Sequence, residues 1–321
     1  MTLPVTVELT EVGMRDGFQM EPRILPTEAK VAVGNALLRA GVKRLEATSF
    51  VSSRAMPQLA DAEELVARLR GRGASIAALA PNRRGAIRAA DAQVDEIVVF
   101  VSASESHNQA NVNRTIENSL EGVTEIADVA AERSVALSGS VATAFGCPFE
   151  GDVPPAAILR VLERYAEVGI RDVVLGDTTG MATPPLIERV LEAVRRELPQ
   201  LEISLHFHNT RGLGLVNVMT GLQLGVTRYE SSLGGLGGCP FAPGATGNVC
   251  SEDLVYMLDE MGISSGIDIE ILCDTARMVE ALFGRQLPGQ VMKAGRRVSR
   301  QCQRTGGHGP GVTSVPARGI E

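Results

Sequence analysis

Two histidines stand two positions apart in the stretch LEISLHFHNTRGLGL, residues 201–215, at the end of an apolar, alternating run. Side chains two apart on a β-strand point to the same side, so His206 and His208 can offer imidazole nitrogens to one cation. An H-x-H pair at a strand end is a weak signal by itself, because such a pair can equally belong to the core or the surface. Further donors at the same place are needed to favour a metal site.

The elements that must position such a site are short β-branched runs that alternate with longer amphipathic segments. We expect eight strands, at residues 5–12, 44–48, 75–79, 96–101, 135–143, 172–175, 202–206 and 227–231. Apolar residues at intervals of three and four predict helices at 27–40, 57–70, 82–91, 115–132, 154–167, 183–197, 211–224 and 249–261. Eight strand–helix units predict an α/β fold with a closed parallel sheet, the (β/α)8 TIM barrel.

The length of 321 residues is compatible with one barrel domain, since such barrels typically need about 250 residues. We therefore expect a barrel domain with a C-terminal helical extension over residues 1–290. Residues 291–321 turn basic and glycine-rich, with little apolar periodicity, and we expect them to form a disordered tail.

The unusual polar residues follow the predicted strands, and in TIM barrels the chemistry lies on the loops at the carboxyl ends of the strands. Arg15, Asp16 and Gln19 follow the first strand, Glu46 ends the second, Thr143 and Cys147 follow the fifth, and Asp177 follows the sixth. A glycine-rich loop after the eighth strand carries Cys239 and ends at Asn248. We expect these groups to share one rim with His206 and His208.

Two imidazoles, the Asp16 carboxylate and the Asn248 carbonyl would leave room for substrate in a six-coordinate shell. This donor set suits Mg²⁺ or Mn²⁺ better than a thiolate-preferring ion, and beside Arg15 it would attract a chelating anion. Iron is the main competitor, because two histidines and one carboxylate also form the site of non-haem oxygenases; dependence on iron and oxygen would reveal that class.

The composition argues against several partners. The formal net charge of −7 and the lack of long basic clusters predict no nucleic-acid binding. A secretory signal and a run of about 18 apolar residues are both missing from the sequence, so we expect a soluble, cytoplasmic protein without a membrane segment. Five widely spaced cysteines fit reduced thiols better than a disulfide framework.

Several motifs together carry a family resemblance. The segments TEVGMRDGFQMEP, LEATSFVS, FGCPFEG, LGDTTG, HFHNTRG and LGGLGGCPFAPGATGNVCSEDLVYML resemble the 3-hydroxy-3-methylglutaryl-CoA lyases, over about residues 5–290. These enzymes belong to a group of metal-dependent lyase and condensing-synthase barrels. The resemblance implies an acyl-CoA substrate and retro-Claisen cleavage to acetyl-CoA and a keto acid, in leucine degradation if the leading substrate is right.

The resemblance also implies roles for individual residues. Asp16, His206, His208 and Asn248 would bind the metal, with His206 also counted among the catalytic groups. Arg15 would stabilise the enolate oxygen, Glu46 would hold Arg15, and Asp177 would lie near the substrate hydroxyl. Cys239 would be a mobile-loop thiol that acts in proton transfer. Gln19, Thr143, Asn209 and Arg211 are expected to contact the substrate.

One motif departs from the family pattern. These lyases read Asp-Thr-Tyr-Gly after the second histidine, whereas this chain reads Asn209-Thr210-Arg211-Gly212. The change makes the mouth of the barrel more positive, which would suit an additional carboxylate or a CoA phosphate there. An Asn after H-x-H is also a feature of the condensing synthases.

The alternatives stay open at this point. Arg15 and Asp16 can form a purely structural salt bridge, Cys239 and Cys147 can be small buried side chains, and Asp177 can cap a turn. For function, the alternatives are a lyase for a related 3-hydroxyacyl-CoA, an acetyl-CoA-dependent condensing synthase, and a non-catalytic binding barrel. A homodimer is a further expectation.

Overall fold

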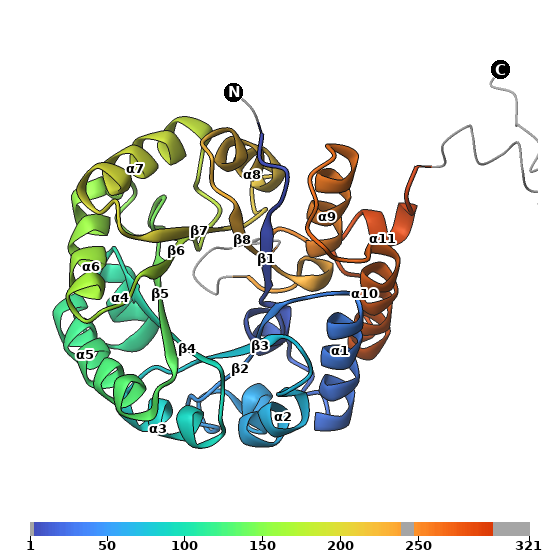
Figure 1. The fold of residues 1–321 in the computed structure, drawn as a ribbon, viewed down its shortest axis with the longest axis horizontal. Helices are drawn as coiled ribbons and strands as arrows, with labels where there is room; N and C mark the ends of the chain where they lie inside the picture. Colours follow the sequence, from blue (N-terminus) through green and yellow to red (C-terminus); the bar gives the residue numbers. More distant parts are fainter. Residues whose placement is uncertain (1–2, 239–246, 298–321) are drawn as a thin grey trace, which may run out of the picture.

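The computed structural model describes residues 3–238 and 247–297. Eight parallel strands close into a barrel in the order β1 to β8 (Figure 1). The strands are β1 (Glu8–Glu11), β2 (Arg44–Ser49), β3 (Ser75–Leu79), β4 (Glu96–Ser102), β5 (Ala136–Ala142), β6 (Asp172–Asp177), β7 (Glu202–Phe207) and β8 (Arg228–Ser231). The predicted TIM barrel is confirmed, and each strand overlaps its expected range.

Helices surround the barrel. They are α1 (Thr27–Arg39), α2 (Ala62–Leu69), α3 (Arg83–Asp91), α4 (Glu105–Val112), α5 (Ile116–Arg133), α6 (Pro155–Glu167), α7 (Pro184–Glu197), α8 (Gly214–Gln223), α9 (Ser251–Glu260), α10 (Ile269–Phe283) and α11 (Val291–Ala294). The expected helical extension is present as α10. Residues 291–294, which the sequence assigned to the tail, form α11 because Val291 and Met292 are buried.

Short irregular helices follow the first and last strands, where the sequence analysis placed none. A π-helical turn, η1 (Gly13–Gly17), follows β1 and is continued by the 3-10 turn η2 (Phe18–Met20). A second 3-10 turn, η4 (Leu233–Gly235), follows β8, and η3 (Pro57–Leu59) precedes α2. Because η1 and η4 contact each other, the loops at the two ends of the barrel sequence meet at the same rim.

Ion pairs lie in the barrel at the amino-terminal ends of the strands, with Arg44 and Glu96 buried and Asp172 and Arg228 half-buried. Arg44 of β2 pairs with Glu96 of β4 and with Asp172 of β6, and Arg228 of β8 also pairs with Asp172. These residues stand at or next to the first positions of their strands, whereas the site residues stand at the opposite ends. The charges therefore close the bottom of the barrel below the site.

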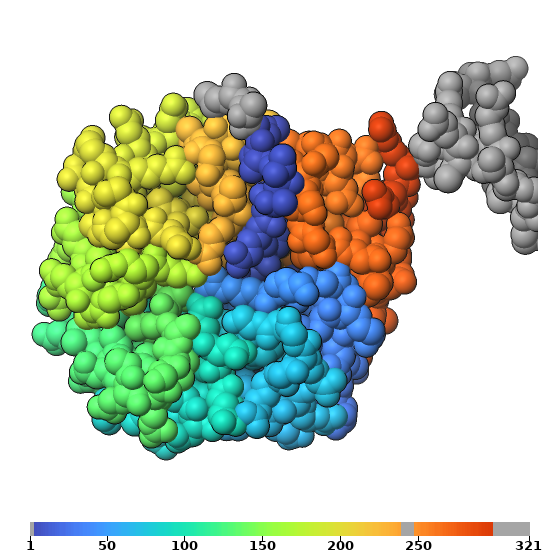
Figure 2. All heavy atoms as spheres, in the orientation of Figure 1, coloured from blue at the N-terminus to red at the C-terminus, as the bar shows by residue number. Residues whose placement is uncertain are grey.

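The N-terminal segment helps to join the barrel to the C-terminal helices. Thr6 pairs with Ser264 in a parallel bridge, and the blue segment fills the seam beside the orange helices in Figure 2. In the same view, atoms cover the centre of the ring, so no open pore is visible on this face. None of the helices in the described residues is long and apolar enough to cross a membrane.

Candidate metal centre and active site

A cavity of about 370 Å³ lies at the carboxyl ends of the strands. One wall is polar and comes from the β1 loop and from β2, β7 and β8; it contains Arg15, Asp16, Gln19, Glu46, His206, His208 and Glu230. The other wall is mainly apolar and includes Leu79, Val98, Phe100, Val112 and Met56. The cavity can thus hold a ligand that is charged on one side and hydrocarbon on the other.

Asp16, His206 and His208 form a cluster whose potential ligand atoms all lie within 4.8 Å of one another. The two histidine Nε2 atoms are 3.1 Å apart. A proton must lie between these nitrogens when no cation is present, because two lone pairs at this distance repel each other. A cation bound by both imidazoles would replace that proton.

Glu230, which was not predicted to be a site residue, orients the imidazole of His206. Its carboxylate lies 2.8 Å from His206 Nδ1 and accepts that hydrogen, so Nε2 is directed to the cluster. Burial lowers the pKa of His206, but the hydrogen bond and charge of Glu230, together with the charge of Asp16, outweigh burial and raise the pKa above the ordinary value. Burial and the neighbouring His206 lower the pKa of His208 to about 3, so His208 is neutral and able to act as a ligand.

Asn248, the fourth ligand predicted from the sequence, lies beside Asp16. Its Nδ2 donates to Asp16 Oδ2 at 2.7 Å and to the carbonyl of Leu236 at 2.9 Å. Its Oδ1 is buried and has no hydrogen-bond partner. A buried carbonyl oxygen without a partner is costly, and its place beside Asp16 fits a metal ligand. Gly237, at φ +107°, packs so closely that a Cβ there would lie 2.4 Å from Asn248 Nδ2.

Arg15 is held by two carboxylates. Its guanidinium donates to Asp16 Oδ1 at 2.6 Å and to Glu46 Oε2 at 2.7 Å. Burial raises the pKa of Asp16, but Arg15, the two histidines and the hydrogen bond from Asn248 together outweigh it and keep the pKa below its usual value, so this carboxyl is ionised. Burial raises the pKa of Glu46 to about 7 although Arg15 acts in the opposite direction. The salt bridge exists, and it also fixes the guanidinium at the cavity wall.

Two of the predicted substrate contacts have different places in the structure. Gln19 lines the cavity, and its amide donates to Asp16 Oδ1 at 3.0 Å. Thr143 is fully buried outside the cavity wall; its hydroxyl donates to the carbonyl of Ala142 and lies 2.7 Å from Ser102 Oγ. Thr143 therefore holds the loop after β5 instead of facing the cavity.

Asp177 has the geometry of a turn cap. Its Oδ1 accepts the backbone N–H groups of Met181 and Ala182, at 2.7 and 2.9 Å. Its Oδ2 is buried and has no hydrogen-bond partner, and burial raises the pKa of the group to about 7. Gly176 and Thr178 on either side line the cavity, whereas Asp177 is not part of its wall. The structure thus supports the capping role directly.

The residues after the second histidine point away from the cavity. Arg211 is exposed and donates to the carbonyls of Thr179 and Gly180, both at 2.8 Å. Asn209 is exposed too, and its Oδ1 accepts the N–H of Gly214. These two side chains brace the loops after β6 and β7, and neither lines the cavity as the expected substrate contact would.

Of the two cysteines considered in the sequence, Cys147 is among the described residues and Cys239 is not. Cys239 lies outside the described residues, although Gly238, directly before it, lines the cavity. Cys147 is buried and accepts a hydrogen bond from Ser104 Oγ at 2.9 Å. This contact fits the structural role expected for Cys147.

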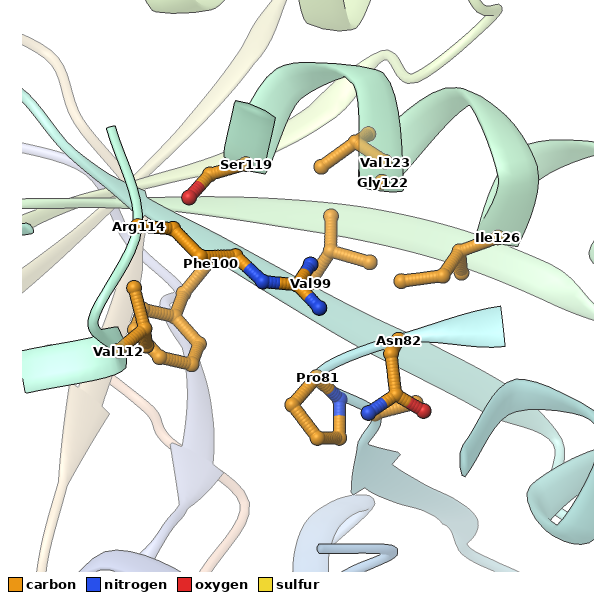
Figure 3. Close-up of a pocket in the computed structure, with 11 residues that line it drawn as sticks. Pro81, Asn82, Val99, Phe100, Val112, Arg114, Ser119, Gly122, Val123 and Ile126 are labelled. Atoms are coloured by element: carbon orange, nitrogen blue, oxygen red, sulfur yellow. The ribbon is translucent and has the colours of Figure 1, made fainter. Parts of the chain in front are cut away.

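A smaller cavity of about 180 Å³ adjoins the first, because Pro81, Phe100 and Val112 line both. Figure 3 shows Arg114 extending across it, with Ser119 and Ile126 of α5 on one side and Asn82 on the other. The smaller cavity lies away from the metal cluster.

The comparisons with known proteins agree with this geometry. A family model described as HMGL-like matches residues 6–279. The chain belongs to the HMGL-like family. It is 42% identical to the hydroxymethylglutaryl-CoA lyase of Bacillus subtilis, over 90% of this chain and 97% of that one. A Pseudomonas aeruginosa relative, named 3-hydroxy-3-isohexenylglutaryl-CoA/hydroxymethylglutaryl-CoA lyase, is 39% identical over 92% of this chain and 98% of its own length.

Solved structures of the HMGL-like family share the fold. The crystal structure of the B. subtilis HMG-CoA lyase matches with a TM-score of 0.89 at 41% identity, covering 92% of this chain and 99% of that one. An HMG-CoA lyase from Acinetobacter baumannii, in complex with coenzyme A and 3-methylmalate, matches with a TM-score of 0.87 at 43% identity, covering 92% and 97%. This member of the HMGL-like family is accordingly an enzyme, a carbon–carbon lyase.

Proposed function

We propose that the protein cleaves 3-hydroxy-3-methylglutaryl-CoA to acetyl-CoA and acetoacetate, by a retro-Claisen reaction that requires Mg²⁺ or Mn²⁺. The observation that carries the proposal is the cluster of Asp16, His206 and His208 in one cavity wall with Arg15. The orphaned Asn248 Oδ1 fits the same cation. The relatives' names support the substrate, and the coenzyme A in the A. baumannii structure supports the thioester.

The reaction shifts electron pairs from the C3 hydroxyl oxygen through the C2–C3 bond to the thioester oxygen. The C3 hydroxyl loses its proton and becomes the carbonyl of acetoacetate while the C2–C3 bond breaks. The electrons from that bond pass to the thioester oxygen as an enolate, and a proton is added at C2 to give acetyl-CoA. A divalent cation at Asp16, His206, His208 and Asn248 would lower the pKa of the substrate hydroxyl.

The residues of the chain supply the remaining requirements. Arg15 provides a fixed positive charge for the enolate oxygen, and the Glu46 and Asp16 carboxylates keep the guanidinium in place before the reaction begins. Glu230 fixes the orientation of His206. The general acid or base is assigned to Cys239, eight residues after the end of β8 in the sequence.

Replacing Cys239 with alanine should reduce kcat by about 10²–10⁴-fold, the usual contribution of one positioned acid or base. Cation binding should be unchanged, because Cys239 is not among the proposed ligands. Steady-state kinetics and Mn²⁺ titration of C239A check both points. Cys147→Ala is the control, because it removes a thiol that has a structural role. Unchanged kcat in C239A would show that another group transfers the proton.

A condensing synthase is the alternative of a different reaction class. It would join acetyl-CoA and a keto acid and release free CoA. The test is to offer the purified enzyme either 3-hydroxy-3-methylglutaryl-CoA or acetyl-CoA with a keto acid. We expect acetyl-CoA and acetoacetate in the first reaction and no release of free CoA in the second. The reverse pattern would establish a synthase.

The apolar wall favours a second substrate, a 3-hydroxyacyl-CoA with a larger 3-substituent. Leu79, Val98 and Phe100 face the metal cluster across the cavity, and the P. aeruginosa relative is named for a substrate with an isohexenyl group. Each buried methylene should raise kcat/KM by up to about fourfold. Measuring kcat/KM for a series of 3-hydroxyacyl-CoA thioesters with 3-alkyl groups of increasing length tests this trend. Ala142→Leu should narrow the cavity and lower kcat/KM for the longer groups. A steady fall from methyl to longer groups in the wild type would rule this substrate out.

A further inference from the structure

Glu11, which the proposed reaction does not use, joins three separate segments. It is the last residue of β1 and is almost completely buried. Its Oε1 accepts the N–H groups of Gly13 and Leu233, at 2.7 and 2.8 Å. Its Oε2 accepts the hydroxyl of Ser251 at 2.5 Å. One carboxylate therefore connects the start of η1, the start of η4 and the start of α9.

Two of the proposed oxygen ligands depend on these segments. Asp16 lies within η1, three residues after Gly13. Asn248 stands three residues before Ser251, and its Nδ2 is bonded to the carbonyl of Leu236, which directly follows η4. Asp16 and Asn248 are 232 positions apart in sequence yet share a 2.7 Å hydrogen bond. Their relative position must be set by contacts between the β1 loop and the β8 loop.

The backbone of η1 packs closely against the Glu11 carboxylate and the backbone of η4. A Cβ on Gly13 would lie 2.6 Å from Glu11 Oε1 and 3.0 Å from the nitrogen of Leu233. Only glycine lets the backbone of η1 approach the carboxylate in this way. The β1 loop, the β8 loop and α9 thus converge on one buried acceptor.

We propose that Glu11 is a positioning residue for the metal centre. It holds the loop that carries Asp16 against η4 and against the start of α9, three residues after Asn248. It acts through the backbone and touches neither the cation nor the substrate. The inference rests on the proposed metal site. Glu11 then sets the affinity of the site for the cation, in addition to stabilising the barrel.

The experiment is a titration of the metal-free protein with Mn²⁺, followed by electron paramagnetic resonance, so the readout does not depend on turnover. Glu11→Ala removes the acceptor for all three donors and should weaken Mn²⁺ binding by about tenfold or more, within the range typical for outer-shell partners. Glu11→Gln keeps one carbonyl oxygen for the two N–H groups and should restore most of the affinity. Saturating Mn²⁺ should recover much of the lost activity of E11A.

Two further variants separate positioning from stability. Ser251→Ala removes a single donor and should weaken Mn²⁺ binding by a few-fold, which keeps the test available if E11A does not fold. Glu96→Gln alters a buried carboxylate at the other end of the barrel, paired with Arg44, and should lower Tm without changing Mn²⁺ affinity.

The outcomes distinguish the two proposals. Weakened binding in folded E11A or in S251A, with unchanged binding in E96Q, supports the positioning role. Wild-type affinity in folded E11A, or in S251A where E11A does not fold, would overturn it while leaving the metal site intact. Failure of the wild type itself to bind Mn²⁺ would instead overturn the proposed metal centre.

Discussion

Replacing Asp16 with alanine should reduce kcat/KM by about 10³-fold or more. Asp16 is the only carboxylate in the cluster with the two histidines, among the residues that the structure describes. A bound cation contributes several kcal/mol to the stabilisation of such a transition state, and about 1.4 kcal/mol corresponds to one power of ten in rate. Mn²⁺ affinity should fall with activity, because two neutral imidazoles and an amide carry no negative charge to balance the ion.

Asp274→Asn provides a matched control for the loss of an aspartate. Asp274 is exposed on α10 and pairs with Arg277 three residues later, so its replacement should change neither Mn²⁺ affinity nor kcat/KM. The melting temperature of D16A should be measured together with its Mn²⁺ affinity and its kcat/KM. A folded D16A protein that binds Mn²⁺ as tightly as the wild type would remove Asp16 from the ligand set.

Arg15→Gln should reduce kcat by about 10²–10³-fold, the effect of losing one preorganised donor to a developing oxyanion. The guanidinium bridges Asp16 and Glu46, so its removal leaves Glu46, whose other oxygen already has no partner, with an uncompensated burial cost. We therefore expect a lower Tm as well. Measuring the kcat of R15Q under saturating Mn²⁺ separates the effect of the missing positive charge from any effect of weaker metal binding.

Arg15→Lys tests whether geometry matters beyond charge. Lysine keeps the positive charge but lacks the planar fork that reaches both carboxylates, so R15K should have a kcat between those of R15Q and the wild type. Arg195→Gln is the control, because Arg195 is exposed on α7 and donates to the carbonyl of Leu224 outside the barrel. Wild-type kcat in R15Q would assign enolate stabilisation to another group.

The barrel was predictable because its strands and helices differ in periodicity along the whole chain. The exceptions are short elements whose stability comes from tertiary contacts. η1 owes its position to Glu11, which accepts the N–H of Gly13, and to the contact with η4. Helix α4 begins at a local cap, since Ser104 Oγ accepts the N–H of His107, and its polar sequence has little apolar periodicity.

The site was predictable where residue type and strand position agreed. Alternation placed His206 and His208 on one side, but Asn248 is brought to this place by an isolated bridge with His208 that no local pattern indicates. Glu230 was not predicted, although the sequence contained a signal for it. A glutamate at the third of the four positions of β8 is unusual in a barrel interior.

The expected contacts of Thr143 and Arg211 were inferred from their positions after strands alone. Which way a loop side chain turns depends on its hydrogen-bond partners. Thr143 turns to the carbonyl of Ala142 and to Ser102, and Arg211 turns to the carbonyls of the β6 loop. These partners are set by the packing of neighbouring loops, which the strand pattern does not contain.

The most direct test of the account is a coupled acetyl-CoA assay on the purified enzyme, first stripped of metal and then given Mg²⁺ or Mn²⁺, with 3-hydroxy-3-methylglutaryl-CoA as substrate. We predict no cleavage without the cation, and acetyl-CoA plus acetoacetate in equal amounts when the cation is restored. Undiminished cleavage by protein shown to be free of metal would contradict the proposed mechanism, and absence of cleavage by the Mn²⁺-bound enzyme would contradict the proposed substrate.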